Sequence, residues 1–121
     1  MTREELVRLD VLMTIADDYE EPVHVWQCVT EDLGPCGFRV APEEAQQALI
    51  ELTESGLAKA YHLSGRAPFA EELQGIPPFD GSHDYYFLIT EDGLQALAVW
   101  RKDWPLDDEG DFISGWAGVG G

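Results

Sequence analysis

The chain has 121 residues, of which 24 are acidic and 7 basic, so its formal net charge at pH 7 is −17. This length corresponds to one domain. A negative charge of this size repels bare nucleic acid and anionic membranes over roughly 8 Å at physiological salt. A membrane-spanning helix is not expected, because no run of about 18 apolar residues is present.

Residues 1–5 lack the apolar core of a signal peptide, so we expect a cytoplasmic protein. The two cysteines, Cys28 and Cys36, are expected to be free thiols, since a reducing compartment disfavours disulfides.

The first predicted helix begins at a capping box formed by Thr2 and Glu5. Two neighbouring apolar stripes follow at helical spacing: Leu6, Leu9, Met13 and Ala16 in one, and Val7, Val11 and Ile15 in the other. A helix this apolar buries more than one face. It is either the central helix of the core or a homodimer contact.

The second predicted helix begins at Pro22, whose missing N–H costs nothing in a first helical turn. Its apolar residues recur at helical spacing and are Val23, Trp26, Val29 and Leu33. Gly34 and Pro35 end it. A strand over residues 23–29 is the alternative, and the longer period favours the helix.

The third predicted helix covers residues 42–55, with Ala45, Leu49 and Leu52 on its apolar face. Its N-cap, Ala41, is a weak one. Acidic side chains in the first turn partly compensate, because they lie near the positive end of the helix dipole. At the other end, Gly56 fits the left-handed position that stops a helix.

Two strands are predicted, over residues 58–62 and 85–89, and we expect them to pair antiparallel. Between them lies a loop of 22 residues, 63–84, in which residues 70–73 could form one helical turn. Thr90 can cap a last helix that ends near Lys102. The leucines expected to be buried together are Leu49, Leu52, Leu57, Leu88, Leu94 and Leu97.

This order of elements resembles the winged helix-turn-helix superfamily, especially its MarR-like and PadR-like members. Their wings close with a strand and a Leu-Thr-x-x-Gly helix start, which stands here as Leu88-Ile89-Thr90-Glu91-Asp92-Gly93. The resemblance implies an α+β winged helix over residues 1–102, with a three-helix core, a two-stranded β-wing carrying a long loop, and a C-terminal helix. Residues 103–121 would then be an acidic tail that contains aromatic residues and glycines.

The resemblance also implies that the third helix reads DNA. Its predicted outward surface consists of Glu43, Glu44, Gln47, Glu51 and Glu54. The cations available for wing or phosphate contacts are Arg39, Lys59 and Arg66. Base readout depends on phosphate contacts that hold the protein in place. Three cations beside four carboxylates therefore disfavour DNA binding through this surface.

Motifs of catalysis and cofactor binding are missing: there is no Gly-x-Ser-x-Gly, P-loop or Rossmann fingerprint. We therefore expect a non-enzyme without a cofactor. His62 and His83 could approach each other near Asp80 or Asp84, but the spacing matches no metal motif. Solvated loop histidines are the expected interpretation.

The sequence thus favours a non-catalytic winged-helix module for protein interaction or regulation, with a protein partner and a possible homodimer through the first helix. A DNA-binding transcription regulator acting as a dimer is the alternative. An acidic DNA mimic is a further one.

Overall fold

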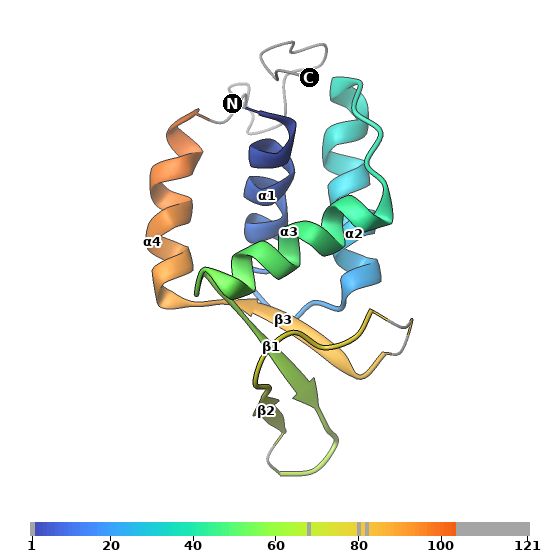
Figure 1. The fold of residues 1–121 in the computed structure, drawn as a ribbon, viewed down its shortest axis with the longest axis vertical. Helices are drawn as coiled ribbons and strands as arrows, with labels where there is room; N and C mark the ends of the chain where they lie inside the picture. The colour runs from blue at the N-terminus through green and yellow to red at the C-terminus, as the bar shows by residue number, and fades with distance from the viewer. Residues whose placement is uncertain (1, 68, 80, 82, 104–121) are drawn as a thin grey trace.

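The computed structural model describes residues 2–67, 69–79, 81 and 83–103, and within them the chain has an α+β fold (Figure 1). Its four α-helices are α1 (Arg3–Thr14), α2 (Pro22–Leu33), α3 (Pro42–Glu54) and α4 (Glu91–Trp100). Short 3-10 helices follow α2 at Gly34–Cys36 and α4 at Arg101–Asp103. The strands β1 (Ala58–Leu63), β2 (Ala70–Glu72) and β3 (Tyr85–Ile89) form one antiparallel sheet in the order β2-β1-β3.

Helix α1 lies at the centre of the fold and packs against α2, α3 and α4 (Figure 1). The predicted capping box is present: the Thr2 hydroxyl accepts from the Glu5 amide at 3.1 Å, and the Glu5 carboxylate accepts from the Thr2 amide at 3.3 Å. The residues of both apolar stripes are buried or packed against the core. Helix α1 is therefore a core helix, and neither stripe is left exposed for a partner.

Helix α2 confirms the helical interpretation of residues 23–33, and the alternative strand over 23–29 is wrong. Its inward face differs from the predicted one, because Val25, Val29 and Leu33 are buried while Val23 is 46% exposed. Trp26 is half-buried, and its indole N–H donates to the carbonyl of Val40 at 2.8 Å.

Helix α3 begins at Pro42 as predicted and ends at Glu54, one residue before the predicted end. The methyl group of Ala41 cannot cap the helix, but the Glu44 carboxylate accepts from the Ala41 amide at 3.1 Å, which supplies half of a capping box. At the other end Gly56 has φ +80°, and the Leu57 amide donates to the Leu52 carbonyl at 2.9 Å. This left-handed turn directs the chain from α3 into β1.

The predicted antiparallel pairing of β1 with β3 is confirmed, and its register runs from Ala58 opposite Ile89 to His62 opposite Tyr85. Strand β2 corrects two predictions, since the sheet has three strands and residues 70–72 are extended rather than helical. The reason is a hairpin in which the Ser64 amide donates to the Phe69 carbonyl at 2.9 Å. It aligns β2 with β1, and strand pairing then outweighs the weak strand propensity of Ala and Glu.

The segment from Thr90 to Gly93 fastens α4 to the turn between α3 and β1. The Thr90 hydroxyl donates to the Gly56 carbonyl at 2.7 Å and accepts from the Gly93 amide at 3.0 Å. Gly93 is buried, and a Cβ atom there would lie 2.1 Å from the carbonyl oxygen of Leu57. Position 93 therefore requires glycine because the backbones approach so closely.

The predicted leucine core is correct for Leu49, Leu52 and Leu97, which are all buried. Leu57 and Leu88 are half-buried. Leu94 is 51% exposed, so its assignment to the core is wrong. The inward face of α4 is set by Gly93 and Leu97, and one helical step turns Leu94 by about 100° from Gly93.

Among the helices in the described residues, none has the length and apolar character needed to cross a membrane. The predicted C-terminal tail lies outside the described residues from position 104 onward.

Candidate functional site

A hollow of about 240 Å³ lies between the beginning of α1 and the exposed surface of α3. Its lining residues are Glu4, Val7, Glu43, Glu44, Gln47, Ala48 and Glu51. Val7 and Ala48 are 3% and 4% exposed and form an apolar floor, while the carboxylates stand around it. We call these seven residues the α1–α3 hollow.

Two arginines of α1 hold two of the four carboxylates in the α1–α3 hollow. Arg3 makes a bidentate contact with Glu44, with Nε to Oε2 at 2.9 Å and Nη2 to Oε1 at 3.1 Å. Arg8 lies 3.7 Å from Glu51, whose carboxylate also accepts from the Gln47 amide group at 3.3 Å. The α1–α3 hollow therefore keeps an excess of two negative charges.

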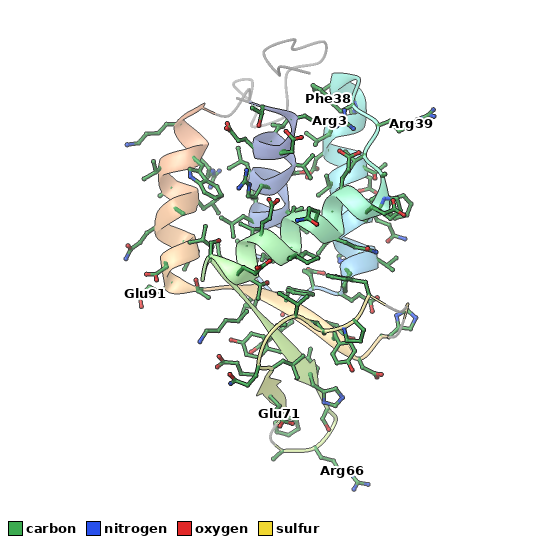
Figure 2. All side chains as sticks on the ribbon, in the orientation of Figure 1. Arg3, Phe38, Arg39, Arg66, Glu71 and Glu91 are labelled. Carbon is green, nitrogen blue, oxygen red and sulfur yellow. The ribbon has the colours of Figure 1, made fainter. Side chains whose placement is uncertain are left out.

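The contact between Arg3 and Glu44 lowers the pKa of the Glu44 carboxyl below its ordinary value, chiefly through the hydrogen bond from the guanidinium. Arg3 also donates to the carbonyl of Arg39 and lies over the ring of Phe38, 5.9 Å from its centroid. Figure 2 shows Arg3, Phe38 and Arg39 gathered where α1 meets the loop before α3. Arg3 is thereby fixed in place.

The predicted surface of α3 is thus partly engaged in contacts within the chain. Glu43, Gln47 and Glu54 are exposed as expected, while Glu44 and Glu51 are half-buried. Of these five residues, all but Glu54 line the α1–α3 hollow. The structure therefore brings four of the five together and adds Glu4 from α1.

The three cations proposed as phosphate contacts are not brought together. Lys59 pairs across the strands with Glu72 at 3.0 Å. Arg39 and Arg66 are exposed, and Figure 2 shows them at opposite ends of the molecule. A phosphate backbone lying along α3 would therefore meet carboxylates between widely separated cations.

No known protein family model matches this chain, and no curated protein matches it either.

The two histidines near the wing do not form a common site. His62 lies in β1 opposite Tyr85, while the imidazole Nδ1 of His83 lies 2.8 Å from the carboxylate of Glu21. This hydrogen bond raises the pKa of His83 above its ordinary value. Asp80 lies outside the described residues. In the described part of the chain, no group of three His, Cys, Asp or Glu residues could hold a metal ion.

Asp10 is a buried carboxyl that the sequence analysis missed. It is 0% exposed on α1, and neither of its oxygens has a hydrogen-bond partner among the described residues. Burial, followed by the nearby carboxyl of Asp32 on α2, raises its pKa to about 9. Asp10 is therefore neutral at pH 7. Its position could have been found, because it lies between Leu6 and Val7 on the helical wheel, at the centre of the apolar face.

The cysteines are both free, as expected. Cys28 Sγ lies 3.6 Å from the imidazole Nε2 of His24. The pKa of each thiol is raised, first by burial and then by neighbouring carboxylates that include Asp32. Both thiols are thus protonated at neutral pH, which makes them poor nucleophiles.

Proposed function

We propose that this chain is a non-catalytic winged-helix module that binds a protein partner through the α1–α3 hollow and does not bind DNA. The observation that carries the proposal is the charge of this surface. Four carboxylates surround an apolar floor, and only two guanidiniums offset them.

The order of elements supports the winged-helix part of the proposal. Three helices precede β1, β2 and β3, and α4 follows them. Strand β2 enlarges the expected wing from two strands to three. In helix-turn-helix proteins of this type, the helix in the place of α3 enters the major groove.

The charge of α3 argues against DNA as the ligand. Proteins gain much of their affinity for DNA by neutralising phosphates with Lys and Arg and releasing the bound counterions. In α3 the charged residues are all acidic: Glu43, Glu44, Glu51 and Glu54. Inserting this helix into a groove would place carboxylates against phosphates.

The shape of the α1–α3 hollow indicates the chemistry of the partner. An arginine side chain combines an apolar stem with a charged head, so it fits an apolar floor rimmed by carboxylates. Glu43 and Glu4 are exposed and form no ion pair within the described residues, which leaves their carboxylates available. The partner in this proposal is a protein segment that presents arginine or lysine.

A titration with labelled DNA duplexes of random and genomic sequence tests the DNA half of the proposal. We expect no binding tighter than about 10⁻⁴ M at physiological salt. Micromolar binding that weakens steeply with salt would instead favour the dimeric transcription regulator. In that case, changing Arg39, Lys59 and Arg66 to Glu should abolish it.

The proposed binding of a protein segment to the α1–α3 hollow can be tested by NMR with a short peptide of alternating Gly and Arg. The same peptide carrying citrulline instead of arginine is the uncharged comparison. We expect the arginine peptide to shift the amide signals of Glu43, Gln47 and Ala48, and the citrulline peptide to leave them unchanged. Shifts spread evenly over all exposed carboxylates would contradict a defined site.

A pair of charge-matched variants sharpens this test. Glu4→Gln with Glu43→Gln should weaken peptide binding roughly fivefold, which corresponds to about 1 kcal/mol for two exposed ion pairs. Glu71→Gln with Glu91→Gln removes the same charge from exposed positions on β2 and α4 and should leave binding unchanged. Equal weakening by both variants would show that only net charge matters.

A further inference from the structure

The outward face of α4 is exposed and free of charge along most of its length. Leu94 and Val99 are 51% and 61% exposed, and Gln95 and Ala98 between them are exposed as well. No charged residue occurs from Gly93 to Trp100. Figure 1 shows α4 at the edge of the molecule, with α1 on one side of it. We call Leu94, Gln95, Ala98 and Val99 the α4 outer face.

Charges of opposite sign stand at the two ends of this face. Glu91 and Asp92 begin the helix, and Arg101 and Lys102 follow its last turn. All four side chains are exposed, and within the described residues none of them forms an ion pair. The surface therefore has two negative charges at one end, an apolar middle and a net charge of +1 at the other end, where Asp103 directly follows Arg101 and Lys102.

Such a surface is complementary to itself when two copies run antiparallel. A two-fold axis between Ala96 and Leu97 relates each residue of α4 to one in the second copy. It places Glu91 opposite Lys102, Asp92 opposite Arg101, Leu94 opposite Val99, and Gln95 opposite Ala98. A parallel arrangement would instead bring like charges together at both ends.

We propose that the α4 outer face is a self-association surface, on which a second copy of this chain packs its own α4 antiparallel. Ala98 is small and near the middle of the face, so the two helix backbones can approach closely. This surface is separate from the α1–α3 hollow, and the two can be occupied at the same time.

The dimer formed by this surface is weak. A helix of 10 residues is about 15 Å long, so it buries less than the ~800 Å² per partner of stable complexes. Two chains of net charge −17 also repel each other at long range. The dissociation constant should be on the order of tens of micromolar, and added salt should tighten the dimer by screening this repulsion.

Sedimentation equilibrium of the full chain at increasing concentration tests the proposal. The wild type should pass from monomer to dimer, and more readily at high salt than at low salt. Leu94→Gln with Val99→Gln changes only exposed residues, so circular dichroism should stay the same while the dimer is lost. A monomer at every concentration, or a dimer insensitive to this double variant, would overturn the proposal.

Charge reversal tests the antiparallel register. Glu91→Lys with Asp92→Lys places cations opposite cations in a homodimer, and Arg101→Glu with Lys102→Glu places carboxylates opposite carboxylates. Each variant alone should be monomeric. An equimolar mixture should dimerise, because every end contact is then between opposite charges.

Glu54→Lys with Glu71→Lys is the matched control for Glu91→Lys with Asp92→Lys, since it makes the same change of net charge at exposed residues of α3 and β2. It should leave the dimer unchanged. Dimerisation of either α4 variant alone, or a mixture that stays monomeric, would rule out the antiparallel pairing.

Discussion

Helices α1 and α4 pack against each other, yet the rest of the chain covers them very differently. Helix α1 also packs against α2 and α3, and even its aspartate at position 10 is buried. Helix α4 lies at the edge and exposes Leu94 and Val99. Both helices have amphipathic sequences. Apolar periodicity therefore shows which residues share a face, whereas the order of elements decides how many faces are covered.

Leucine truncation should give the largest difference between the two helices. Leu12 on α1 is fully buried, so Leu12→Ala should lower the free energy of unfolding by about 2–5 kcal/mol. Leu94→Ala on α4 should change it by no more than ~0.5 kcal/mol, because the side chain is half exposed. Urea denaturation of the monomer measures both. Equal losses would show that α4 is covered as fully as α1.

The sequence predicted the parts of the fold that depend on neighbouring residues. The capping box of Thr2 and Glu5, the stop at Gly56 and the cap at Thr90 each act within one helical turn, and all three are present. Strand β2 was missed because Ala70, Glu71 and Glu72 have weak strand propensity. Their conformation comes from pairing with β1.

Only part of the candidate site was predicted, because local sequence patterns reveal only features that depend on neighbouring residues. The acidic residues on the exposed surface of α3 follow from helical periodicity and were identified. The contact of Arg3 with Glu44 joins residues 41 positions apart, so no local pattern reveals it. The two apolar stripes of α1 indicated either a core helix or a homodimer contact, since they gave no sign that α2, α3 and α4 would pack against this helix.

Asp10 offers a second way to probe the burial of α1, through pH. Its pKa is raised from 3.8 to about 9, so between these values the folded state binds a proton that the unfolded state releases. The folded state is thus favoured below pH 4, and this stability is lost as pH rises towards 9. From pH 5 to pH 7 the contribution of Asp10 to the free energy of unfolding should fall by ~3 kcal/mol, which is about 1.4 kcal/mol for each pH unit.

The variant Asp10→Asn cannot titrate, so it isolates this effect. Between pH 5 and pH 7, the unfolding free energy of the wild type should fall by ~3 kcal/mol relative to that of the variant. Chemical denaturation at several pH values measures it. A difference that stays constant over this range would show that Asp10 is solvated rather than buried.

Gly93 determines how closely α4 approaches the body of the domain. In Gly93→Ala the new methyl group would lie 2.1 Å from the Leu57 carbonyl oxygen and 2.6 Å from Ile89 Cγ1. Overpacking of this kind should cost about 1–3 kcal/mol of unfolding free energy. Thermal unfolding measures the loss.

The matched control is Gly34→Ala at the end of α2. Gly34 has φ −55°, and among the described residues, apart from its chain neighbours and the nearby backbone of its own helix, no atom lies within 4 Å of the position of its Cβ. Alanine there should stabilise the protein by about 0.4–1 kcal/mol, because it restricts the unfolded chain. If both substitutions change stability in the same direction, the close approach at Gly93 is not the cause.

The contact between α1 and α3 should give the smallest effect, and its dependence on pH runs opposite to that of Asp10. A double-mutant cycle with Arg3→Met and Glu44→Gln should give a coupling energy of about 1 kcal/mol at pH 7, since the ion pair is bidentate and only partly exposed.

The lowered pKa of Glu44 means that the stability from this ion pair is present above the ordinary pKa of 4.5. It is lost as pH falls through the lowered folded-state pKa, so the coupling should shrink as the solution is acidified below pH 4.5. The exposed pair of Lys59 and Glu72 serves as the control and should show a smaller coupling. A coupling for Arg3 and Glu44 that is unchanged at low pH would mean that the stacking of Arg3 on Phe38, rather than charge, joins α1 to α3.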